Sequence, residues 1–174
     1  GGHVLWMDIS RNVANENITK EQANAIGKDF LEKHGFGEMK ESYFTNENGV
    51  LTINYAFNQN GIICYPDLVK VKVALDNGEV LGLESQSYLN SHRKRDLPKV
   101  NISMQEAQKK INSKLEILSS TVTIIPTDWK TEVAAYEFKG KMNDRNFIVY
   151  INIENGREEK VFMILDTPGG TFTI

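Results

Sequence analysis

The strongest constraint on the fold of this chain is a short motif that occurs twice, roughly 80 residues apart. It reads isoleucine, a hydroxyl residue, two further residues, glutamine or glutamate, and alanine, and it occupies Ile18–Ala23 and Ile102–Ala107. The hydroxyl of Thr19 or Ser103 can accept a hydrogen bond from the amide three residues later, while the Gln or Glu side chain reaches back to the amide of the hydroxyl residue. This reciprocal pair is a capping box, so the motif predicts the beginning of a helix at two places.

A helical pattern of apolar residues follows each capping box. On the first predicted helix the apolar side chains that share one face are Ala23, Ile26, Phe30 and Leu31. On the second they are Ala107, Ile111 and Leu115. Gly35 is a suitable stop for the first helix, whereas the end of the second is less clear. We expect two helices of about three to four turns, and such short helices need a surface on which to pack.

Strand patterns that follow each helix supply that surface. Candidate strands lie at 50–57, 68–75 and 79–83 after the first helix and at 132–138, 147–153 and 160–165 after the second. The pairs Asn77-Gly78 and Asn155-Gly156 each separate two of these runs, which predicts hairpins because both turn residues can adopt positive φ. Capped helices and Asn-Gly hairpins occur in many α+β proteins, but their recurrence here in the same order favours an internal duplication.

This order of elements predicts an α+β fold with two units, each a helix packed on an antiparallel sheet. We expect the units at 17–89 and 102–174, joined by a polar, basic linker at 90–101 that contains Pro98.

The two ends of the chain share a form, Gly-Gly followed by an alternating run. It occurs at Gly1–Met7 and again at Gly169–Ile174, where it closes the second unit with a short edge strand. Residues 1–16 are therefore expected to hold the last strand of a preceding unit. The alternative is an ordinary first strand behind the remnant of a purification tag.

Charge, hydropathy and cysteine content exclude several functional classes. The formal net charge is −3 and the pI is about 5.7, whereas a nucleic-acid-binding chain usually carries a clear basic excess. The sequence holds no run of about 18 apolar residues that could cross a membrane. Cys64 is the single cysteine, so it has no partner for an internal disulfide and is expected to be a small buried apolar residue.

We predict no catalytic, cofactor-binding or metal-ligating residue. His3, His34 and His92 lack the spacing of a zinc site, and His34 is expected in the last turn of the first helix. Neither a serine-nucleophile motif nor a phosphate-binding glycine loop occurs. Asp76 and Glu154 lie at predicted hairpin turns, where solvated carboxylates are common, so we do not interpret them as a glycosidase pair. The sequence therefore favours a protein that is not an enzyme.

Two features are candidates for binding. The run His92–Arg95 concentrates positive charge and could meet an acidic protein surface, peptidoglycan or a membrane, although a solvated linker is the simpler interpretation. Trp129 lies in a polar turn and is expected to be partly exposed, whereas Trp6 is expected to pack in the core. Tyr65 and Tyr88 complete a set of aromatic residues that could mark an interface.

The strands and their Asp-Asn-Gly or Glu-Asn-Gly turns resemble those of PepSY domains. Nearly the whole chain is similar to the C-terminal region of the YpeB family of sporulation and germination proteins in spore-forming Firmicutes. The stretches that carry this resemblance most specifically are Gly1–Met7, Tyr65–Val80 and Tyr136–Gly140.

The resemblance implies a role that composition and spacing do not reveal. Such proteins carry an N-terminal membrane anchor, act in the spore envelope outside the inner spore membrane, and bind and stabilise or restrain a cortex-lytic peptidoglycan hydrolase such as SleB. PepSY domains also occur in peptidase propeptides, so a peptidase inhibitor or a module that binds peptidoglycan directly is the alternative. The resemblance supplies no catalytic motif and no cofactor.

Overall fold

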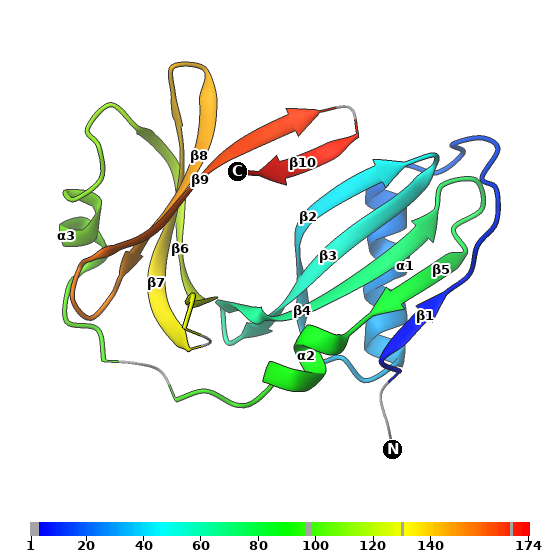
Figure 1. The fold of residues 1–174 in the computed structure, drawn as a ribbon, viewed down its shortest axis with the longest axis horizontal. Coiled ribbons are helices and arrows are strands. Elements are labelled where there is room, and N and C mark those ends of the chain that lie inside the picture. Colours follow the sequence, from blue (N-terminus) through cyan, green and yellow to red (C-terminus); the bar gives the residue numbers. More distant parts are fainter. Residues whose placement is uncertain (1–3, 97–98, 130, 168) are drawn as a thin grey trace.

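The computed structural model describes residues 4–96, 99–129, 131–167 and 169–174, and it is shown in Figure 1. In the N-terminal half, residues 4–96, the elements are β1 (Trp6–Asp8), α1 (Lys20–Lys33), β2 (Met39–Glu47), β3 (Val50–Gln59), β4 (Ile62–Ala74), β5 (Val80–Glu84) and α2 (Gln86–Ser91). In the C-terminal half, residues 99–174, they are α3 (Met104–Gln108), β6 (Glu116–Pro126), β7 (Glu132–Met142), β8 (Arg145–Asn152), β9 (Glu158–Thr167) and β10 (Gly170–Thr173).

The strands of both halves join in one sheet that closes on itself. The strand order is β1-β5-β4-β3-β2-β10-β9-β8-β7-β6, and an additional parallel pairing joins β4 to β6. Cys64 lies opposite Ile124 in that pairing, and Gly170 of β10 lies opposite Thr45 of β2 on the other side. Eight strands, from β4 round to β6, thus form a closed barrel, with β5 and β1 extending the sheet beyond β4.

The predicted fold class, an α+β chain of two helix-on-sheet units, is therefore wrong. Strands make up 50% of the described residues and helices only 15%, and the two expected sheets are parts of one closed eight-stranded barrel. No strand was predicted at 39–47 or 116–126, yet both segments are strands, β2 and β6. A period-two pattern indicates which side chains of a strand are buried, but it does not indicate which strands pair. Two small sheets would leave backbone N–H and C=O groups unpaired at their edge strands, and joining the sheets provides hydrogen-bond partners for those groups.

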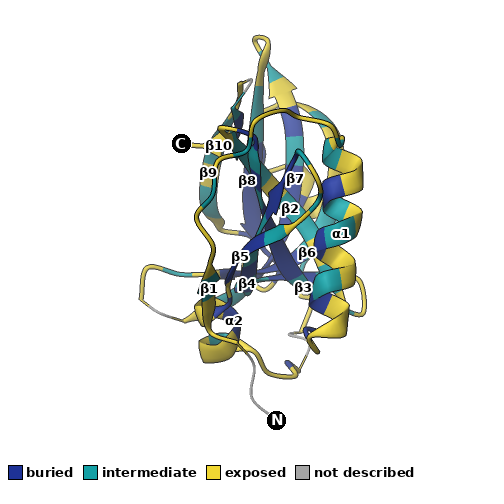
Figure 2. Ribbon diagram, turned by 90° about the vertical axis from the view of Figure 1, so that its right-hand side faces the viewer, coloured by how far each residue is buried: buried dark blue, intermediate teal, exposed yellow. Residues whose placement is uncertain are grey.

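Helix α1 begins and packs as its sequence predicts. Thr19 Oγ1 accepts from the Gln22 amide at 3.3 Å, and Gln22 Oε1 accepts from the Thr19 amide at 2.8 Å, so the capping box is confirmed. Gly35 follows the helix with φ of 78°, a conformation that glycine adopts at little cost. The helix covers the outer face of β2–β5, as Figures 1 and 2 show, and its buried residues are Ala23, Gly27 and Leu31.

Helix α3 has the second capping box but not the predicted length. Ser103 Oγ accepts from the Glu106 amide at 3.2 Å, and Glu106 Oε2 accepts from the Ser103 amide at 2.7 Å. The helix nevertheless ends after five residues, and Ile111 and Leu115 are buried from turns rather than from a helix. The expectation of three to four turns is wrong here, because Ile111 stands where α1 has Gly27, the residue that lets that helix lie close to its sheet.

Both Asn-Gly hairpins are present, but with a different turn than predicted. Gly78 and Gly156 have positive φ, whereas the asparagines before them do not, so the prediction that both turn residues adopt positive φ is wrong at these sites. Two consecutive positive φ values occur instead at Asn48-Gly49, Asn60-Gly61 and Asn143-Asp144. These are the two-residue connections of β2–β3, β3–β4 and β7–β8.

The segments at the predicted unit boundaries pack against the sheet. β1 pairs with β5 in antiparallel fashion, and Trp6 on β1 is 65% exposed, so its predicted role in the core is wrong. Gly1–His3, and Pro98 of the expected linker, lie outside the described residues. The division into 1–16, 17–89, 90–101 and 102–174 stays a prediction.

The barrel has two kinds of buried face. Outside, α1 closes one apolar core over β2–β5, and α3 with the turns after it closes another over β6–β8. Inside, a smaller apolar cluster is formed by Ile125, Ala135, Ile148 and Tyr150. Figure 2 shows the buried strands in the middle of the molecule and the exposed outer side of α1. Among the described residues, no helix is long and apolar enough to span a membrane.

Candidate functional site

Part of the basic run after α2 belongs to an ionic cluster whose central ion pair is buried. We define the junction cluster as Asp67, His92, Arg93, Arg95 and Glu132. Asp67 comes from a bulged part of β4, Arg95 from the segment after α2, and Glu132 from the first residue of β7. The cluster therefore joins the N-terminal half to the C-terminal half beside the β4–β6 pairing.

Arg95 is the centre of the junction cluster. Its guanidinium donates to both Asp67 oxygens at 2.9 and 2.6 Å, and to Glu132 Oε2 and Oε1 at 2.8 and 2.9 Å. The Asp67 side chain is fully buried and that of Arg95 is 6% exposed. Hydrogen bonding to Arg95 lowers the pKa of Glu132, and the two carboxylates together raise the pKa of Arg95. A buried charge placed between two carboxylates in this way is fully compensated.

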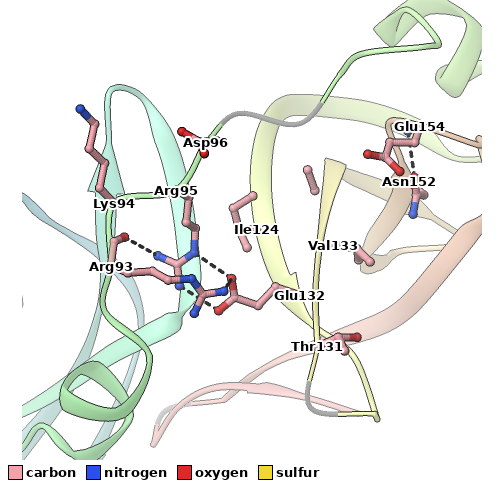
Figure 3. Close-up of a pocket in the computed structure, with 11 residues that line it drawn as sticks. Arg93, Lys94, Arg95, Asp96, Ile124, Thr131, Glu132, Val133, Asn152 and Glu154 are labelled. Carbon is pink, nitrogen blue, oxygen red and sulfur yellow. Dashed lines mark hydrogen bonds and ion pairs between the residues drawn. The ribbon is translucent and has the colours of Figure 1, made fainter.

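The neighbouring basic side chains differ in their freedom. His92 Nδ1 lies 2.9 Å from Asp67 Oδ2, and its ring stacks on Tyr88 with centroids 4.2 Å apart. Arg93 donates to Glu132 at 2.8 Å but keeps 59% of its side chain exposed. Within the described residues Lys94 has no hydrogen bond or ion pair, and Figure 3 shows it pointing away from the cluster. The interpretation of 92–95 as a solvated linker is therefore wrong for Arg95, which is buried, whereas His92 is exposed and contacts Asp67.

A polar pocket of about 600 Å³ lies beside the junction cluster. Figure 3 shows Arg93, Arg95 and Glu132 on one side of it and Asn152 and Glu154 across it on the other. Of its three lining carboxylates, Asp96, Glu132 and Glu154, Glu132 is held by two arginines. The pocket is suited to hydrogen bonding and charge pairing with a polar partner.

The turn between β6 and β7 carries the most exposed aromatic residue. Trp129 is 87% exposed, which confirms its predicted exposure. Thr127 and Thr131 hold the turn closed by a backbone hydrogen bond of 2.8 Å and a hydroxyl contact of 2.6 Å. Thr131 also lines the polar pocket, so the tryptophan and the pocket belong to the same end of β7. Lys130 lies outside the described residues.

The other candidate residues are placed in the interior or in ion pairs. Cys64 is 1% exposed and burial raises the pKa of its thiol, which confirms a small apolar role. Tyr88 is 5% exposed and Tyr65 lies inside the barrel, so neither forms an exposed interface. Asp76 is not simply solvated, because it pairs with Arg11 at 2.7 Å.

Metal ligands do not gather in the part of the chain that the structure describes, where no group of three or more His, Cys, Asp or Glu residues could hold an ion. The residues that sequence reasoning missed are acidic: Asp67, Glu132 and the barrel residue Glu137. A carboxylate directly after a proline, as at Pro66-Asp67, and carboxylates within the apolar run of β7 were the available signals.

Comparison with known proteins decides the family. The family described as YpeB sporulation, PepSY1 and PepSY2 domains matches residues 1–98, and the family described as peptidase propeptide and YPEB domain matches residues 101–162. This chain belongs to the YpeB sporulation family. The predicted resemblance to YpeB and its PepSY domains is therefore confirmed.

Curated relatives and a solved structure agree with this family. The sporulation protein YpeB of Halalkalibacterium halodurans is 35% identical over 161 residues, and that of Bacillus subtilis is 34% identical over 165 residues. Each match covers 92% of this chain but only 36% of the relative's length. The solved Bacillus megaterium YpeB C-terminal domain is 31% identical with a TM-score of 0.86, and the match covers 95% of this chain and 74% of that one. A role related to sporulation follows, and neither family description names a catalytic activity of the matched domains.

Proposed function

We propose that this chain is the non-catalytic binding part of a spore-germination protein that binds and stabilises, or restrains, a cortex-lytic peptidoglycan hydrolase such as SleB. The observation that carries the proposal is the match to sporulation proteins named YpeB over 92% of the chain. Its site of action would be the spore envelope outside the inner spore membrane, with the longer parent protein anchored in that membrane.

The surface that we assign to the partner is the polar pocket together with Trp129. Tryptophan and arginine are enriched among residues that dominate protein–protein binding, and here Trp129 and Arg93 lie on segments that border one pocket. The junction cluster keeps the pocket wall rigid, since Arg95 is fixed by both Asp67 and Glu132. A partner would therefore meet a pocket wall that is already ordered, and binding would not have to order Arg95 or Glu132.

An alternative role is inhibition of a peptidase, and the printed description of the family that matches residues 101–162, peptidase propeptide and YPEB domain, favours it. Direct binding to peptidoglycan is the other alternative. Both alternative roles would use a groove or a sheet edge. An assay that offers the chain each kind of partner distinguishes these roles from hydrolase binding.

A capture experiment tests these possibilities together. The immobilised 174-residue chain is presented with a cortex-lytic hydrolase, with purified sacculi, and with a secreted metallopeptidase whose activity is followed. We expect retention of the hydrolase alone. Retention on sacculi without capture of the hydrolase would replace the proposal with direct peptidoglycan binding, and inhibition of the peptidase would support the propeptide role.

Variants locate the surface. Trp129→Ala, and Arg93→Glu combined with Lys94→Glu, should each weaken hydrolase capture about tenfold or more if they remove a central contact. Lys114→Glu is the matched control, because Lys114 is exposed but does not line the pocket. Unchanged capture by both pocket variants would move the binding surface elsewhere on the chain.

A further inference from the structure

The interior of the barrel contains an apolar cavity of about 230 Å³. Residues of seven strands line it, from β2, β4, β6, β7, β8, β9 and β10, so it lies within the closed sheet rather than on its outer surface. Its apolar walls are Ile125, Ile148, Phe162 and Ile164 together with the rings of Tyr65 and Tyr150. A cavity with walls of this kind favours an apolar ligand body.

A buried carboxylate, Glu137, lies beside the cavity without lining it, because it bonds two tyrosines of the cavity wall. Glu137 is 2% exposed, and its Oε2 accepts from Tyr65 Oη at 2.6 Å and from Tyr150 Oη at 2.8 Å. It lines a neighbouring pocket with Ser119 and Thr121, and that pocket shares Ser42, Tyr65 and Lys139 with the cavity. Burial, with the charge of Glu137 acting in the same direction, raises the pKa of both tyrosines, so their hydroxyls stay protonated and remain donors to Glu137.

The charged residues that do line the cavity are both lysines. Lys139 on β7 and Lys160 on β9 are 44% and 30% exposed, and among the described lining residues there is no Asp or Glu. Their ion pairs are long, since Lys139 lies 3.5 Å from Glu137 and Lys160 lies 3.5 Å from the exposed Asp128. Two weakly held ammonium groups at an apolar cavity attract an anion and repel a cation.

We propose that the barrel cavity binds a small carboxylate whose apolar body packs between Ile148 and Phe162 and whose carboxylate group pairs with Lys160 and Lys139 at the rim. The volume is below the range of about 300–1,000 Å³ that is usual for sites of drug-sized ligands, so the ligand has on the order of ten non-hydrogen atoms. This site is independent of the hydrolase-binding surface, because it shares no lining residue with the polar pocket.

Titration with three probes of equal length tests the proposal. Octanoate, 1-octanol and octylammonium are added separately to the isotope-labelled chain, and amide and methyl shifts are followed by NMR. We expect saturable shifts of Ile125, Ile148 and Ile164 with octanoate, and at least about fivefold weaker binding of the alcohol and the amine, which lack the anion.

The lysines allow a matched pair of variants. Lys160→Met should weaken octanoate binding about three- to fivefold, the upper part of the range for one exposed ion pair. Lys141→Met should leave it unchanged, because Lys141 is on the same strand as Lys139 but pairs with Asp144 and does not line the cavity. Ile148→Phe should fill the cavity and abolish binding; if that variant does not fold, the lysine pair still decides the outcome.

Three results would overturn the proposal. They are the absence of saturable shifts at the cavity residues, equal binding of all three probes, and equal octanoate affinity in Lys160→Met and the unchanged chain. Hydrolase capture serves as an independent readout, since failure of the cavity to bind octanoate would leave capture through Trp129 untouched.

Discussion

The N-terminal and C-terminal halves dock the segment before their helix in the same way. Two consecutive amides donate to one strand-end carbonyl: Asn17 and Ile18 to Leu75, and Asn101 and Ile102 to Ile153. The hairpin glycines are packed alike as well, because a Cβ on Gly78 would meet Ile18 and Ile26, and one on Gly156 would meet Ile102 and Lys110. Counting from the capping boxes, Lys110 takes the place of Ile26, so the halves diverge along the helix itself.

One position explains most of that divergence. In α1, Gly27 lies against Tyr55, and a Cβ there would clash with the tyrosine oxygen, so glycine lets the helix lie directly on the sheet. Tyr55 Oη then donates to Asn24 Oδ1 at 2.9 Å, beneath the helix. The matching position in the C-terminal half is Ile111, which is too large for such an approach. There Tyr136 Oη donates to Ile102 O at 2.9 Å, at the start of α3 instead.

The comparison shows that a capping box begins a helix but does not decide its length. Continuation needs side chains that bury against the sheet, because a short helix is marginal without packing. α1 packs against β2, β3, β4 and β5, whereas α3 packs mainly against β7. The C-terminal half keeps its core by burying Ile111 and Leu115 from turns, and it relies more on its sheet and on its attachment to the N-terminal half.

The largest expected effect comes from breaking that attachment at Arg95. Arg95→Met keeps much of the side-chain volume but leaves Asp67 buried without its guanidinium partner. The loss of one partner from a buried ion pair should lower the free energy of unfolding by about 3–5 kcal/mol, as measured by urea denaturation. If the halves depend on each other, the variant should still unfold in one transition.

Exposed pairs provide the control for this variant. Lys33→Met removes an ion pair with Asp29 in which both side chains are more than half exposed, and it should cost under about 1 kcal/mol. Two separate unfolding transitions in Arg95→Met, one for each half, would mean that the junction cluster alone couples the halves and that the barrel pairing does not.

The next effect tests the Gly27 explanation directly. Gly27→Ala places a methyl group against Tyr55 and should destabilise the chain by about 1–3 kcal/mol through overpacking, although alanine is the better helix former. Thermal unfolding followed by circular dichroism gives the magnitude. Adding Tyr55→Phe removes the oxygen that the new methyl group would meet. In a double-mutant cycle, the double variant should therefore lose less stability than the sum of the two single variants.

The matched change in the C-terminal half is Ile111→Ala. Ile111 is 8% exposed, so its truncation should cost about 2–4 kcal/mol by cavity formation without any coupling to Tyr136→Phe. A stabilising effect of Gly27→Ala, or an equal coupling in both halves, would refute the role assigned to this position.

These residues also mark what the sequence could predict. The capping boxes, α1, both hairpins, the exposed Trp129, the buried Cys64 and the YpeB family are local patterns or resemblances, and they are confirmed. Closure of the barrel depends on the pairing of Cys64 with Ile124 across the two halves, and no local pattern records it. The junction cluster was not predicted for the same reason, since Glu132 meets Arg95 only once the barrel is closed.

The two capping boxes offer a smaller and more direct test of the comparison. Thr19→Ala and Ser103→Ala each remove the same side-chain acceptor, which is typically worth about 1 kcal/mol. We expect that full cost for Thr19, because 14 residues of α1 follow its cap, and about half of it for Ser103, because α3 has five. Chemical denaturation with both variants and the unchanged chain measures the difference, and a larger cost at Ser103 would contradict the view that α3 contributes little.

The smallest expected effect concerns the acidic residues that precede the two Asn-Gly turns. Asp76 is held by Arg11, and this hydrogen-bonded ion pair lowers the pKa of the Asp76 carboxyl below its usual range. A carboxyl whose pKa is lower in the folded state stabilises the fold above its unfolded-state pKa of about 4, and that contribution is lost as the pH falls through the folded-state value.

Within the described residues Glu154, the counterpart of Asp76 in the C-terminal half, has no ion pair. Asp76→Asn should therefore be slightly less stable than the unchanged chain at about pH 6, with a smaller deficit at about pH 3, whereas Glu154→Gln should match the unchanged chain at both. Urea midpoints measured at the two pH values decide the matter, because a deficit of Asp76→Asn that persists undiminished at low pH would assign its effect to packing of the turn and not to the charge of the carboxylate.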